Sequence, residues 1–338
     1  MTSINAWFIG SSQVMQEVRA RIARVAVTRL PVLIEGPTGA GKELVARALH
    51  DASERSGPFV AINVCAIAES LFEDTMFGHV RGAFSGAIAD RAGAFTEAHR
   101  GTLFLDEISG LPVTSQSKLL RAIETGAFRA VGARADRDSD FRLISATNVP
   151  LLEAIRASGF REDLAYRLCG TTIRVPALAS HREDIAELAR HFARIAGRGR
   201  PTIPDVSDEA IALLQRQPWP GNVRQLKHVV ECAATFSDSA RISRHDILRV
   251  LQEIDVSPSS DGDAFERRRL CDTLRAFDWD TERAAAHLGI HRASIYRRMQ
   301  RLGINVRQRG RYDRRTSPID RVDPLELPSD RHPSLEQA

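Results

Sequence analysis

One short segment, GPTGAGKE (residues 36–43), has the composition of a loop that binds phosphate groups. Its glycines let backbone N–H groups close on phosphate oxygens, and its lysine places a positive charge where the β and γ phosphates would lie. The segment follows an apolar run and precedes a helical pattern, which is the context that a phosphate loop needs. We therefore expect a nucleoside triphosphate to be held by Gly36, Pro37, Thr38, Gly39, Ala40, Gly41, Lys42 and Glu43.

Two neighbouring acids supply the second part of such a site. Glu43 stands where a serine or threonine usually holds Mg²⁺, so the metal ligand is expected elsewhere. The apolar segment GTLFLDEI delivers Asp106 and Glu107 to the carboxyl end of a buried strand, beside the phosphate loop. We expect Asp106 to orient Mg²⁺ and Glu107 to activate the attacking water.

These side chains need a sheet to position them, and the first half of the chain has the pattern of one. Short apolar runs alternate with helical stretches, which predicts a parallel sheet with helices on both faces. The expected strands are residues 30–36, 59–64, 101–108, 141–148 and 171–176. The fourth ends in Thr147 and Asn148, polar groups suited to sensing the γ-phosphate or positioning water.

The pattern changes after residue 176, where helical periodicity replaces the β-branched runs and predicts a helical subdomain. A polar segment rich in Ser, Gly and Pro then reads as a linker, and the arginine-rich end lacks the apolar content to fold. We expect an α/β nucleotide-binding part at 7–175, a helical part at 176–254, a linker at 255–263, an all-α domain at 264–305 and a disordered tail at 306–338.

Composition limits the class of protein. The 338 residues are 43% hydrophobic and 27% charged, which is enough apolar material for one large and one small domain. No run of eighteen apolar residues and no secretory signal is present, so we expect no membrane partner and a cytoplasmic location. The net charge of +4 is small, so nucleic-acid binding needs a local basic cluster. The four cysteines lack a C-x-x-C pair, which argues against a metal or disulfide framework and favours buried thiols.

The segment GAFSGA (residues 82–87) mounts one large aromatic side chain, Phe84, among glycines and alanines. Gly82 and Gly86 allow positive φ, and the alanines add almost no side chain that could cover the ring. The residues alone leave two readings open: a turn whose aromatic ring packs into the core, or a loop that presents the ring to solvent.

Residues 281–304 have the form of a helix-turn-helix, with a short helix, Gly289 at the turn and a second helix from His291. Ile295, Met299 and Leu302 recur at the spacing of a buried stripe on the second helix. The side chains expected to reach DNA bases and phosphates are His291, Arg292, Ser294, Arg297, Arg298 and Arg301. A basic, solvated helix in a small bundle is the alternative.

The helix that precedes this segment carries its own apolar stripe. Leu270, Leu274 and Phe277 lie on one side of it. We expect this stripe to be a dimerisation face, and therefore expect paired DNA half-sites.

In this order and spacing, GPTGAGKE, GAFSGA, FLDEI, FREDLAYRL and WPGNVRQL resemble the AAA+ bacterial enhancer-binding proteins, which activate RNA polymerase carrying sigma-54. GAFSGA is similar to the family's GAFTGA loop, which touches sigma-54 during the ATP cycle, with Ser85 in place of the threonine. The resemblance implies that Phe84 is exposed because its partner is another protein. The implied sigma-54 contact consists of Gly82, Ala83, Phe84, Ser85, Gly86 and Ala87.

The same resemblance implies an ATPase site with Mg²⁺. GPTGAGKE matches the family's Walker A segment, including its glutamate, and Asp106 and Glu107 match Walker B. Asn63 falls where the family has an asparagine that couples the nucleotide state to the catalytic glutamate. Arg161 and Arg167 match the arginine-finger segment, which implies a homo-oligomeric ring, usually a hexamer, whose subunits complete each other's sites.

A second sensor arginine is implied at Arg224, in WPGNVRQL. The residues themselves support this position, because Asn222 is a good helix N-cap with Gln225 three residues on. Such a cap would fix the start of the helix and aim Arg224 from its first turn. The preceding segment ALASHRED lacks part of the family's charged L-R-E-R-type run and has Ala179 and Ser180 in its place.

The implied function is ATP-dependent activation of transcription from enhancer DNA through sigma-54 RNA polymerase. Because the ATPase part starts within the first ten residues, we expect control in trans, by concentration or by a partner. Two alternatives remain: a DNA-binding regulator that uses ATP only as a ligand, and an AAA+ remodeller of another protein. Both leave GAFSGA without a purpose.

Overall fold

The computed structural model describes residues 7–253, except 157–158, 199–203 and 238, together with part of the segment 270–304. In that segment the described residues are 270, 271, 273, 274, 277, 279–287, 295, 296, 299, 302 and 304. The chain divides into two compact units, Met1–Ile254 and Asp255–Ala338. The expected linker (255–263) and tail (306–338) lie outside the described residues.

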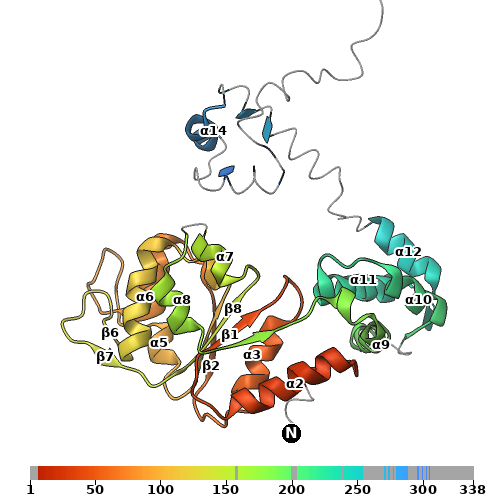
Figure 1. The fold of residues 1–338 in the computed structure, drawn as a ribbon, viewed down its shortest axis with the longest axis horizontal. Helices are drawn as coiled ribbons and strands as arrows, with labels where there is room; N and C mark the ends of the chain where they lie inside the picture. The colour runs from red at the N-terminus through yellow and green to blue at the C-terminus, as the bar shows by residue number, and fades with distance from the viewer. Residues whose placement is uncertain are drawn as a thin grey trace, which may run out of the picture. The chain divides into compact units, whose positions relative to one another are not determined.

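A five-stranded parallel sheet forms the centre of the first unit (Figure 1). Its strands run in the order β2-β5-β8-β1-β9, so the strand that leads into the phosphate loop has a neighbour on each side. Each of the five expected runs forms one of these strands, shortened by up to two residues at an end, and the predicted α/β class is confirmed. The bounds are β1 (Val32–Glu35), β2 (Phe59–Asn63), β5 (Thr102–Asp106), β8 (Arg142–Thr147) and β9 (Thr171–Arg174).

Helices cover both faces of this sheet (Figure 1), as a parallel sheet with apolar strands requires. Side chains alternate along β1: Val32 and Ile34 belong to one apolar core, and Leu33 belongs to the other. The first core lies under α2 (Gln13–Ala26) and α3 (Lys42–Asp51). The second lies under α4 (Glu69–Phe77), α5 (Ala94–Glu97), α6 (Val113–Thr125), α7 (Leu151–Arg156) and α8 (Glu162–Leu168).

Two short hairpins extend from the second face. One pairs β3 (Gly78–His79) with β4 (Arg91–Ala92), and the other pairs β6 (Ala127–Phe128) with β7 (Arg137–Asp138). The pattern of the sequence did not predict them, because a two-residue strand is too short to show a period.

The helical subdomain has its own core, in which Trp219 and Phe192 are buried. The apolar side chains of Ile185, Leu188 and Ala189, which recur at helical spacing, are buried there as well. A two-residue parallel pair, β10 (Asp205–Val206) and β11 (Arg241–Ile242), was not predicted. The helices are α9 (Ile185–Ala196), α10 (Asp208–Arg216), α11 (Asn222–Phe236) and α12 (Arg244–Glu253), which lie together at one side of the sheet (Figure 1).

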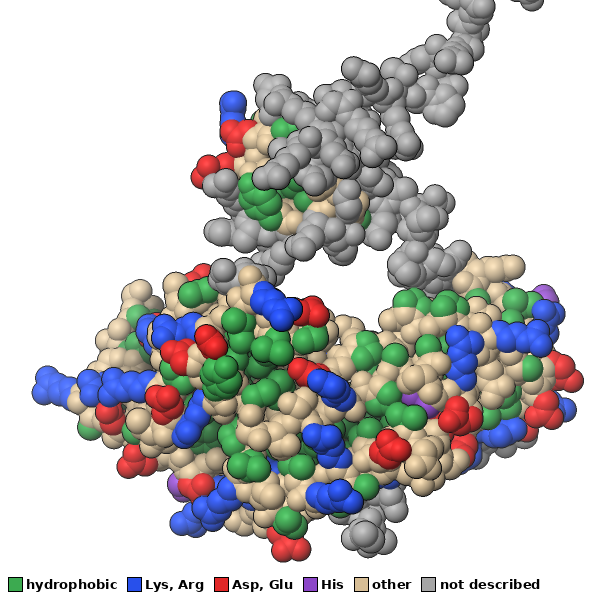
Figure 2. Space-filling model, in the orientation of Figure 1, with side chains coloured by type: hydrophobic (Ala, Val, Ile, Leu, Met, Phe, Trp, Pro, Cys, Tyr) green, Lys and Arg blue, Asp and Glu red, His purple; other side chains and the backbone are tan. Residues whose placement is uncertain are grey.

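Lys and Arg side chains alternate with Asp and Glu over the face of the first unit seen in Figure 2. This mixture agrees with the small net charge of the chain. No helix among the described residues is both long and apolar enough to cross a membrane. The expectation of buried thiols is wrong for Cys65 and Cys169, which are exposed, whereas Cys271 is buried.

The second unit contains α14 (Thr281–His287) and a small apolar core. The predicted stripe of Ile295, Met299 and Leu302 is buried in that core. Leu270 and Leu274 are buried against it too, so their predicted role as a dimerisation face is wrong: they pack inside their own unit. The expected DNA-contacting residues His291, Arg292, Ser294, Arg297, Arg298 and Arg301 lie outside the described residues.

Candidate functional site

The phosphate loop joins β1 to α3 and depends on two glycines. Gly39 and Gly41 have φ angles of 77° and 100°, a left-handed conformation that L-residues with a side chain rarely adopt. A Cβ at position 39 would also lie 2.3 Å from the carbonyl oxygen of Gly221. Glycine is therefore required at position 39 by the backbone and by the neighbouring helical subdomain that contains α9 to α12, which is named here the lid.

Lys42 is the first residue of α3 and turns back over the loop. Its Nζ donates hydrogen bonds to the carbonyl oxygens of Gly36 (2.8 Å) and Pro37 (3.2 Å). Burial lowers the pKa of Lys42, and the carboxylates of Asp106 and Glu107 act in the opposite direction. The predicted lysine and the predicted acid pair therefore lie close enough to interact.

The acid pair sits at the carboxyl end of β5. Oδ1 of Asp106 accepts a hydrogen bond from the backbone N–H of Glu107 (2.9 Å). Glu107 has φ 56° and ψ 38°, a left-handed conformation that costs about 1–2 kcal/mol for a residue with a Cβ. Both residues are half-buried. The sharp turn ends the strand at the point where the two carboxylates are delivered.

The donor set around Asp106 fits Mg²⁺ held jointly with nucleotide phosphates. Burial raises the pKa of Asp106, because a carboxylate in this position is poorly solvated, and a divalent cation would neutralise that charge. Within the described part of the chain, no group of three or more His, Cys, Asp or Glu side chains could hold a metal alone. Mg²⁺ commonly uses one or two carboxylates and completes its shell with phosphates and water.

An Asp106→Asn variant is expected to be more stable than the unchanged, nucleotide-free protein at neutral pH. Because the folded-state pKa of Asp106 is raised, the folded chain holds this proton more tightly than the unfolded chain, so ionisation of Asp106 costs stability above both pKa values. As the pH falls to about 4, Asp106 becomes neutral and the advantage of asparagine should shrink. Urea unfolding at the two pH values measures the difference.

The matched control is Asp90→Asn, because exposed Asp90 also accepts a backbone N–H, from Arg81 at 2.8 Å. That variant should change stability by less than about 0.5 kcal/mol at either pH. An Asp106→Asn protein that is less stable than the unchanged protein at neutral pH would contradict the electrostatic argument.

The polar residues at the ends of neighbouring strands differ in how available they are. Asn63 pairs in register with Asp106, but its Oδ1 accepts from the N–H groups of Cys65 (3.0 Å) and Ala66 (3.2 Å). Thr147 is fully buried, and its hydroxyl donates to the carbonyl oxygen of Val149 and accepts from the N–H of the same residue.

Asn148 is the strand-end residue that reaches the phosphate loop. It is exposed, and its Nδ2 donates to Oγ1 of Thr38 (3.3 Å). Of the pair Thr147 and Asn148, the structure therefore brings the second to the nucleotide side and ties the first into its own turn.

The lid contacts the phosphate loop through the start of α11. The predicted N-cap at Asn222 is wrong: Gly221 is the cap residue, and Asn222 is the first helical residue, with φ 51°. Oε1 of Gln225 accepts from the N–H of Gly221 (3.0 Å), and the N–H of Arg224 donates to the carbonyl oxygen of Gly39 (3.2 Å). Arg224, which is exposed, also contributes to lowering the pKa of Lys42.

Asn222 connects three segments and is 4% exposed. Its Nδ2 donates to the carbonyl oxygens of Thr38 (3.0 Å) and Pro220 (3.3 Å), and its Oδ1 accepts from the N–H of Leu178 (2.9 Å). Asparagine suits this place because it tolerates the left-handed conformation better than most residues. The sequence pointed to this residue but not to its partner, because the bond to Thr38 spans 184 positions.

An Asn222→Asp variant is expected to lose at least about 2 kcal/mol of stability. The substitution keeps the shape and the acceptor for Leu178, but it turns a carboxylate oxygen toward the carbonyl oxygens of Thr38 and Pro220. Urea unfolding checks the value. Asn148→Asp, at an exposed asparagine that also contacts Thr38, should cost less than about 1 kcal/mol. Equal costs at the two positions would show that the buried contacts of Asn222 carry no special weight.

A buried carboxylate ties the N-terminal segment to the lid. Asp184 is 1% exposed and accepts hydrogen bonds from the N–H groups of Ser11 and Ser12 (2.9 Å each), from Oγ of Ser12 (2.5 Å) and from Nδ1 of His181 (3.0 Å). A Cβ at Gly10 would collide with this carboxylate at 2.4 Å. The residues before α2 are therefore fixed to the start of the lid.

The two predicted finger arginines lie on α8, and their partners here are local. Arg161 is the N-cap residue of that helix, and its guanidinium pairs with Asp163 (2.6 Å). Nη2 of Arg167 donates to the carbonyl oxygen of Glu124 on α6 (3.3 Å). Both arginines are exposed, so they are available to another molecule and are not part of the cluster around Lys42.

The GAFSGA segment lies in the loop between β3 and β4. Gly82 and Gly86 have φ angles of 80° and 111°, and a Cβ at either would meet nothing within 4 Å. The N–H of Gly82 donates to the carbonyl oxygen of Ala87 (2.8 Å), which closes the loop. Phe84 is 47% exposed and touches the ring of His79 edge-on, with 4.9 Å between ring centroids. Of the two readings left open above, the structure shows the exposed ring.

The loop surface differs in detail from the implied contact set. Ala87 is buried and Ala83 is half-buried, so these two alanines support the turn rather than offering surface. Ile88 is 83% exposed and was not among the expected residues. An apolar residue directly after the motif was the available signal for it.

The base of the loop is held from two sides. Asp74 on α4 accepts from Nδ1 of His79 (2.5 Å) and from Arg91 (2.9 Å). Val131 of the second hairpin accepts from the N–H of Val80 (3.1 Å) and donates to the carbonyl oxygen of Gly78 (2.8 Å). A loop with an open tip is thus mounted on a fixed base.

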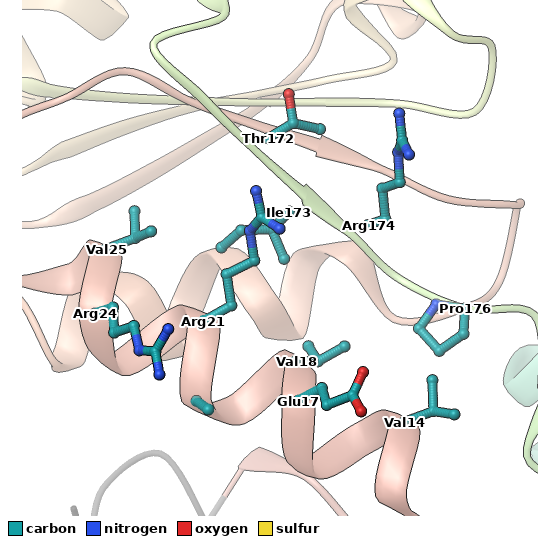
Figure 3. Close-up of a pocket in the computed structure, with 11 residues that line it drawn as sticks. Val14, Glu17, Val18, Arg21, Arg24, Val25, Thr172, Ile173, Arg174 and Pro176 are labelled. Carbon is teal, nitrogen blue, oxygen red and sulfur yellow. The ribbon is translucent and has the colours of Figure 1, made fainter.

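A groove of about 840 Å³ lies between α2 and β9, one of the two edge strands of the sheet (Figure 3). Arg21 reaches from α2 toward Ile173 on the strand, and Glu17 lies on the same helix (Figure 3). None of the lining residues belongs to the phosphate loop or the acid pair, so this groove is not the nucleotide site.

Family models for three successive domains match this chain. A sigma-54 interaction domain matches residues 8–174, an AAA+ ATPase lid domain matches 179–263, and a bacterial regulatory protein domain of the Fis family matches 263–302. The order agrees with the order of parts that the sequence suggested.

Individual relatives support the same grouping. The transcriptional regulatory protein ZraR of Salmonella typhimurium is 40% identical over 300 residues, which cover 87% of this chain and 68% of ZraR. The transcriptional regulator VasH of Vibrio cholerae is 47% identical over 237 residues, covering 69% of this chain and 45% of VasH. The crystal structure of NtrX from Brucella abortus in complex with ATP has a TM-score of 0.66 and 34% identity, covering 88% of this chain and 69% of that one.

The chain spans about half the length of several curated relatives: 45% of VasH and 52% of NtrC from Rhizobium meliloti. Because 68% of ZraR is covered at 40% identity, the predicted resemblance is confirmed. This chain belongs to the sigma-54-dependent transcriptional activators, with AAA+ and lid parts followed by a Fis-type helix-turn-helix segment.

Proposed function

We propose that this chain is an ATP-hydrolysing activator that binds enhancer DNA and remodels RNA polymerase carrying sigma-54 until the promoter opens. The loop of residues 82–87 is the observation that carries the proposal. It exposes Phe84 on a fixed base within the same unit that holds the phosphate loop. An exposed aromatic side chain between two glycines has no role in the core, so it fits a partner protein.

Hydrolysis would use the groups gathered at the carboxyl edge of the sheet. The N–H groups of the phosphate loop and Nζ of Lys42 would hold the β and γ phosphates of ATP. Asp106 would hold Mg²⁺, which when bound offsets the phosphate charge. Glu107 would accept a proton from the attacking water, and Asn148 would orient the γ-phosphate or that water.

The active form would be a ring of identical subunits, by analogy with the family a hexamer. Arg161 and Arg167 are exposed on α8 and lie outside the cluster around Lys42, so in a ring they can serve a neighbour's nucleotide. Their present partners, Asp163 and the carbonyl oxygen of Glu124, are weak enough competitors to be exchanged for phosphate.

Recognition of enhancer DNA would belong to the second unit. The Fis-family match over residues 263–302 supports this assignment, and the residues proposed to contact DNA are the six basic or polar residues named from the sequence between 291 and 301. The small net charge of the chain means that these residues, rather than the whole surface, would supply the electrostatic attraction.

Capture of isolated sigma-54 by the full-length protein tests the proposal. We expect binding with ADP and aluminium fluoride, which mimic the hydrolysis transition state, and little binding with ADP alone. The transition-state complex should bring the loop forward, and the ground state should not. A preparation that hydrolyses ATP but fails to bind sigma-54 under both conditions would refute sigma-54 as the partner.

A further inference from the structure

A second concave site lies at the end of the sheet where the parallel strands begin, opposite the end that carries the phosphate loop. It is a pocket of about 450 Å³ lined by residues 26–29, 53–56 and 140–142 together with Arg100, and is named here the basic pocket. The phosphate loop follows the carboxyl end of β1, whereas Arg142 is the first residue of β8. A strand of the length of β8 separates the amino and carboxyl ends of the sheet by roughly 20 Å. The basic pocket is therefore separate from the nucleotide site.

The pocket carries more positive than negative charge. Four of its lining residues are arginines and two are acids, namely Arg29, Arg55, Arg100, Arg142, Glu54 and Asp140. Asp140 is already engaged, because its Oδ1 pairs with Arg55 at 3.1 Å. The arginines Arg29, Arg100 and Arg142 form no ion pair within the described part of the chain, so positive charge is left over.

Arg142 makes this surplus unusual because it is buried, with 3% of its surface exposed. Two of its guanidinium nitrogens donate to the carbonyl oxygens of Ala26 (2.5 Å) and Val25 (2.9 Å) at the end of α2, and its Nε has no hydrogen-bond partner. Burial, together with the nearby charge of Arg55, lowers the pKa of Arg142 to about 10. A buried cation that is held only by carbonyl dipoles and lacks a counter-ion is stabilised when an anion binds beside it.

The walls of the pocket are held in place without a ligand. Arg55 donates to the carbonyl oxygens of Arg100 (3.3 Å) and Asp140 (3.0 Å), and the N–H of Arg100 donates to Asp140 (2.6 Å). Arg100 itself has a left-handed φ of 59°. Next to it, a Cβ at Gly101 would lie 2.0 Å from the carbonyl oxygen of Pro58, so the segments on either side pack backbone to backbone. Such a site is preformed and pays little ordering cost on binding.

We infer that the basic pocket binds a small, multiply charged, phosphate-bearing anion that is distinct from the hydrolysed ATP. Its volume lies in the range of small-ligand pockets, and its lining includes the buried cation Arg142. Arginine guanidinium groups match phosphate oxygens in shape as well as charge. The site goes beyond the proposed function and does not depend on it.

Calorimetric titration of inorganic pyrophosphate into the full-length protein tests this inference, with saturating ADP present to fill the phosphate loop. We expect one additional site per chain. Arg29→Glu, at the exposed rim, should weaken it at least about tenfold, whereas Arg24→Glu, the same charge change on α2 outside the pocket, should leave it unchanged. Substitution of Arg142 is avoided as the main test, because it also removes the bonds that end α2.

The source of the anion is separated in a second arm with the full-length Lys42→Ala protein. If GDP binds this protein more than about tenfold tighter than pyrophosphate, and Arg29→Glu weakens both, the ligand is a nucleotide. If pyrophosphate binds as tightly as GDP, the ligand of the basic pocket is a free anion. Absence of the additional site, or equal binding by the Arg29→Glu and Arg24→Glu proteins, would overturn the inference while leaving ATP hydrolysis and the proposed function untouched.

Discussion

ATP turnover by a Glu107→Gln variant is expected to fall at least about a hundredfold, while ATP binding stays close to that of the unchanged protein. The amide has the same shape as the carboxylate but cannot accept the proton of the attacking water. Glu107 projects from a left-handed turn after β5, and its charge acts on Lys42. Phosphate release measures turnover, and nucleotide titration measures binding.

The control for this experiment is Glu153→Gln, an exposed carboxylate on α7. It should hydrolyse ATP within about twofold of the unchanged protein, because surface substitutions away from a site change little. Undiminished hydrolysis in the Glu107→Gln protein would remove this residue from its proposed role and would shift attention to Asp106.

The second large effect concerns the loop. A Phe84→Ala protein is expected to keep its ATPase activity within about twofold but to lose promoter opening entirely. Truncation of a half-exposed ring whose ring partner is His79 leaves no cavity in the core, so the fold and the nucleotide site should be unaffected. Open-complex formation with sigma-54 polymerase on a promoter template measures the loss.

Phe236→Ala is the matched control for the loop variant, since Phe236 is a 58% exposed phenylalanine at the end of α11, away from the loop. It should open the promoter normally. Promoter opening by Phe84→Ala at the unchanged rate would mean that the aromatic ring is not the contact. The next residue to test would then be Ile88, which the structure shows as the more exposed apolar side chain.

The sheet could be predicted from sequence because each strand is a continuous apolar run with a clear end. The run around Leu103 and Leu105 was long enough to show burial and ended in charged residues, so both the strand and Asp106 were found. The two hairpins had no such run. Their register depends on contacts between separate loops, such as the bonds between Val131 and the backbone of Gly78 and Val80.

The lid side of the site could be predicted only in part, because its contacts join residues far apart in the chain. WPGNVRQL indicated a helix start but placed the cap one residue late, since the left-handed φ of Asn222 comes from its tertiary partners Thr38 and Leu178. Likewise Thr147 looked available as a polar strand end. Only the structure shows that its hydroxyl is used up by Val149.

The close approach of the lid to Gly39 has a consequence for how this family can change over evolutionary time. A side chain at position 39 would strike the carbonyl oxygen of Gly221, so a single substitution there displaces two subdomains at once. Position 39 can accept a larger residue only if the lid retreats in the same lineage. Positions 39 and 221 should therefore change together or stay fixed. A chimera that joins the phosphate loop of one member to the lid of another would be destabilised where these two positions do not match.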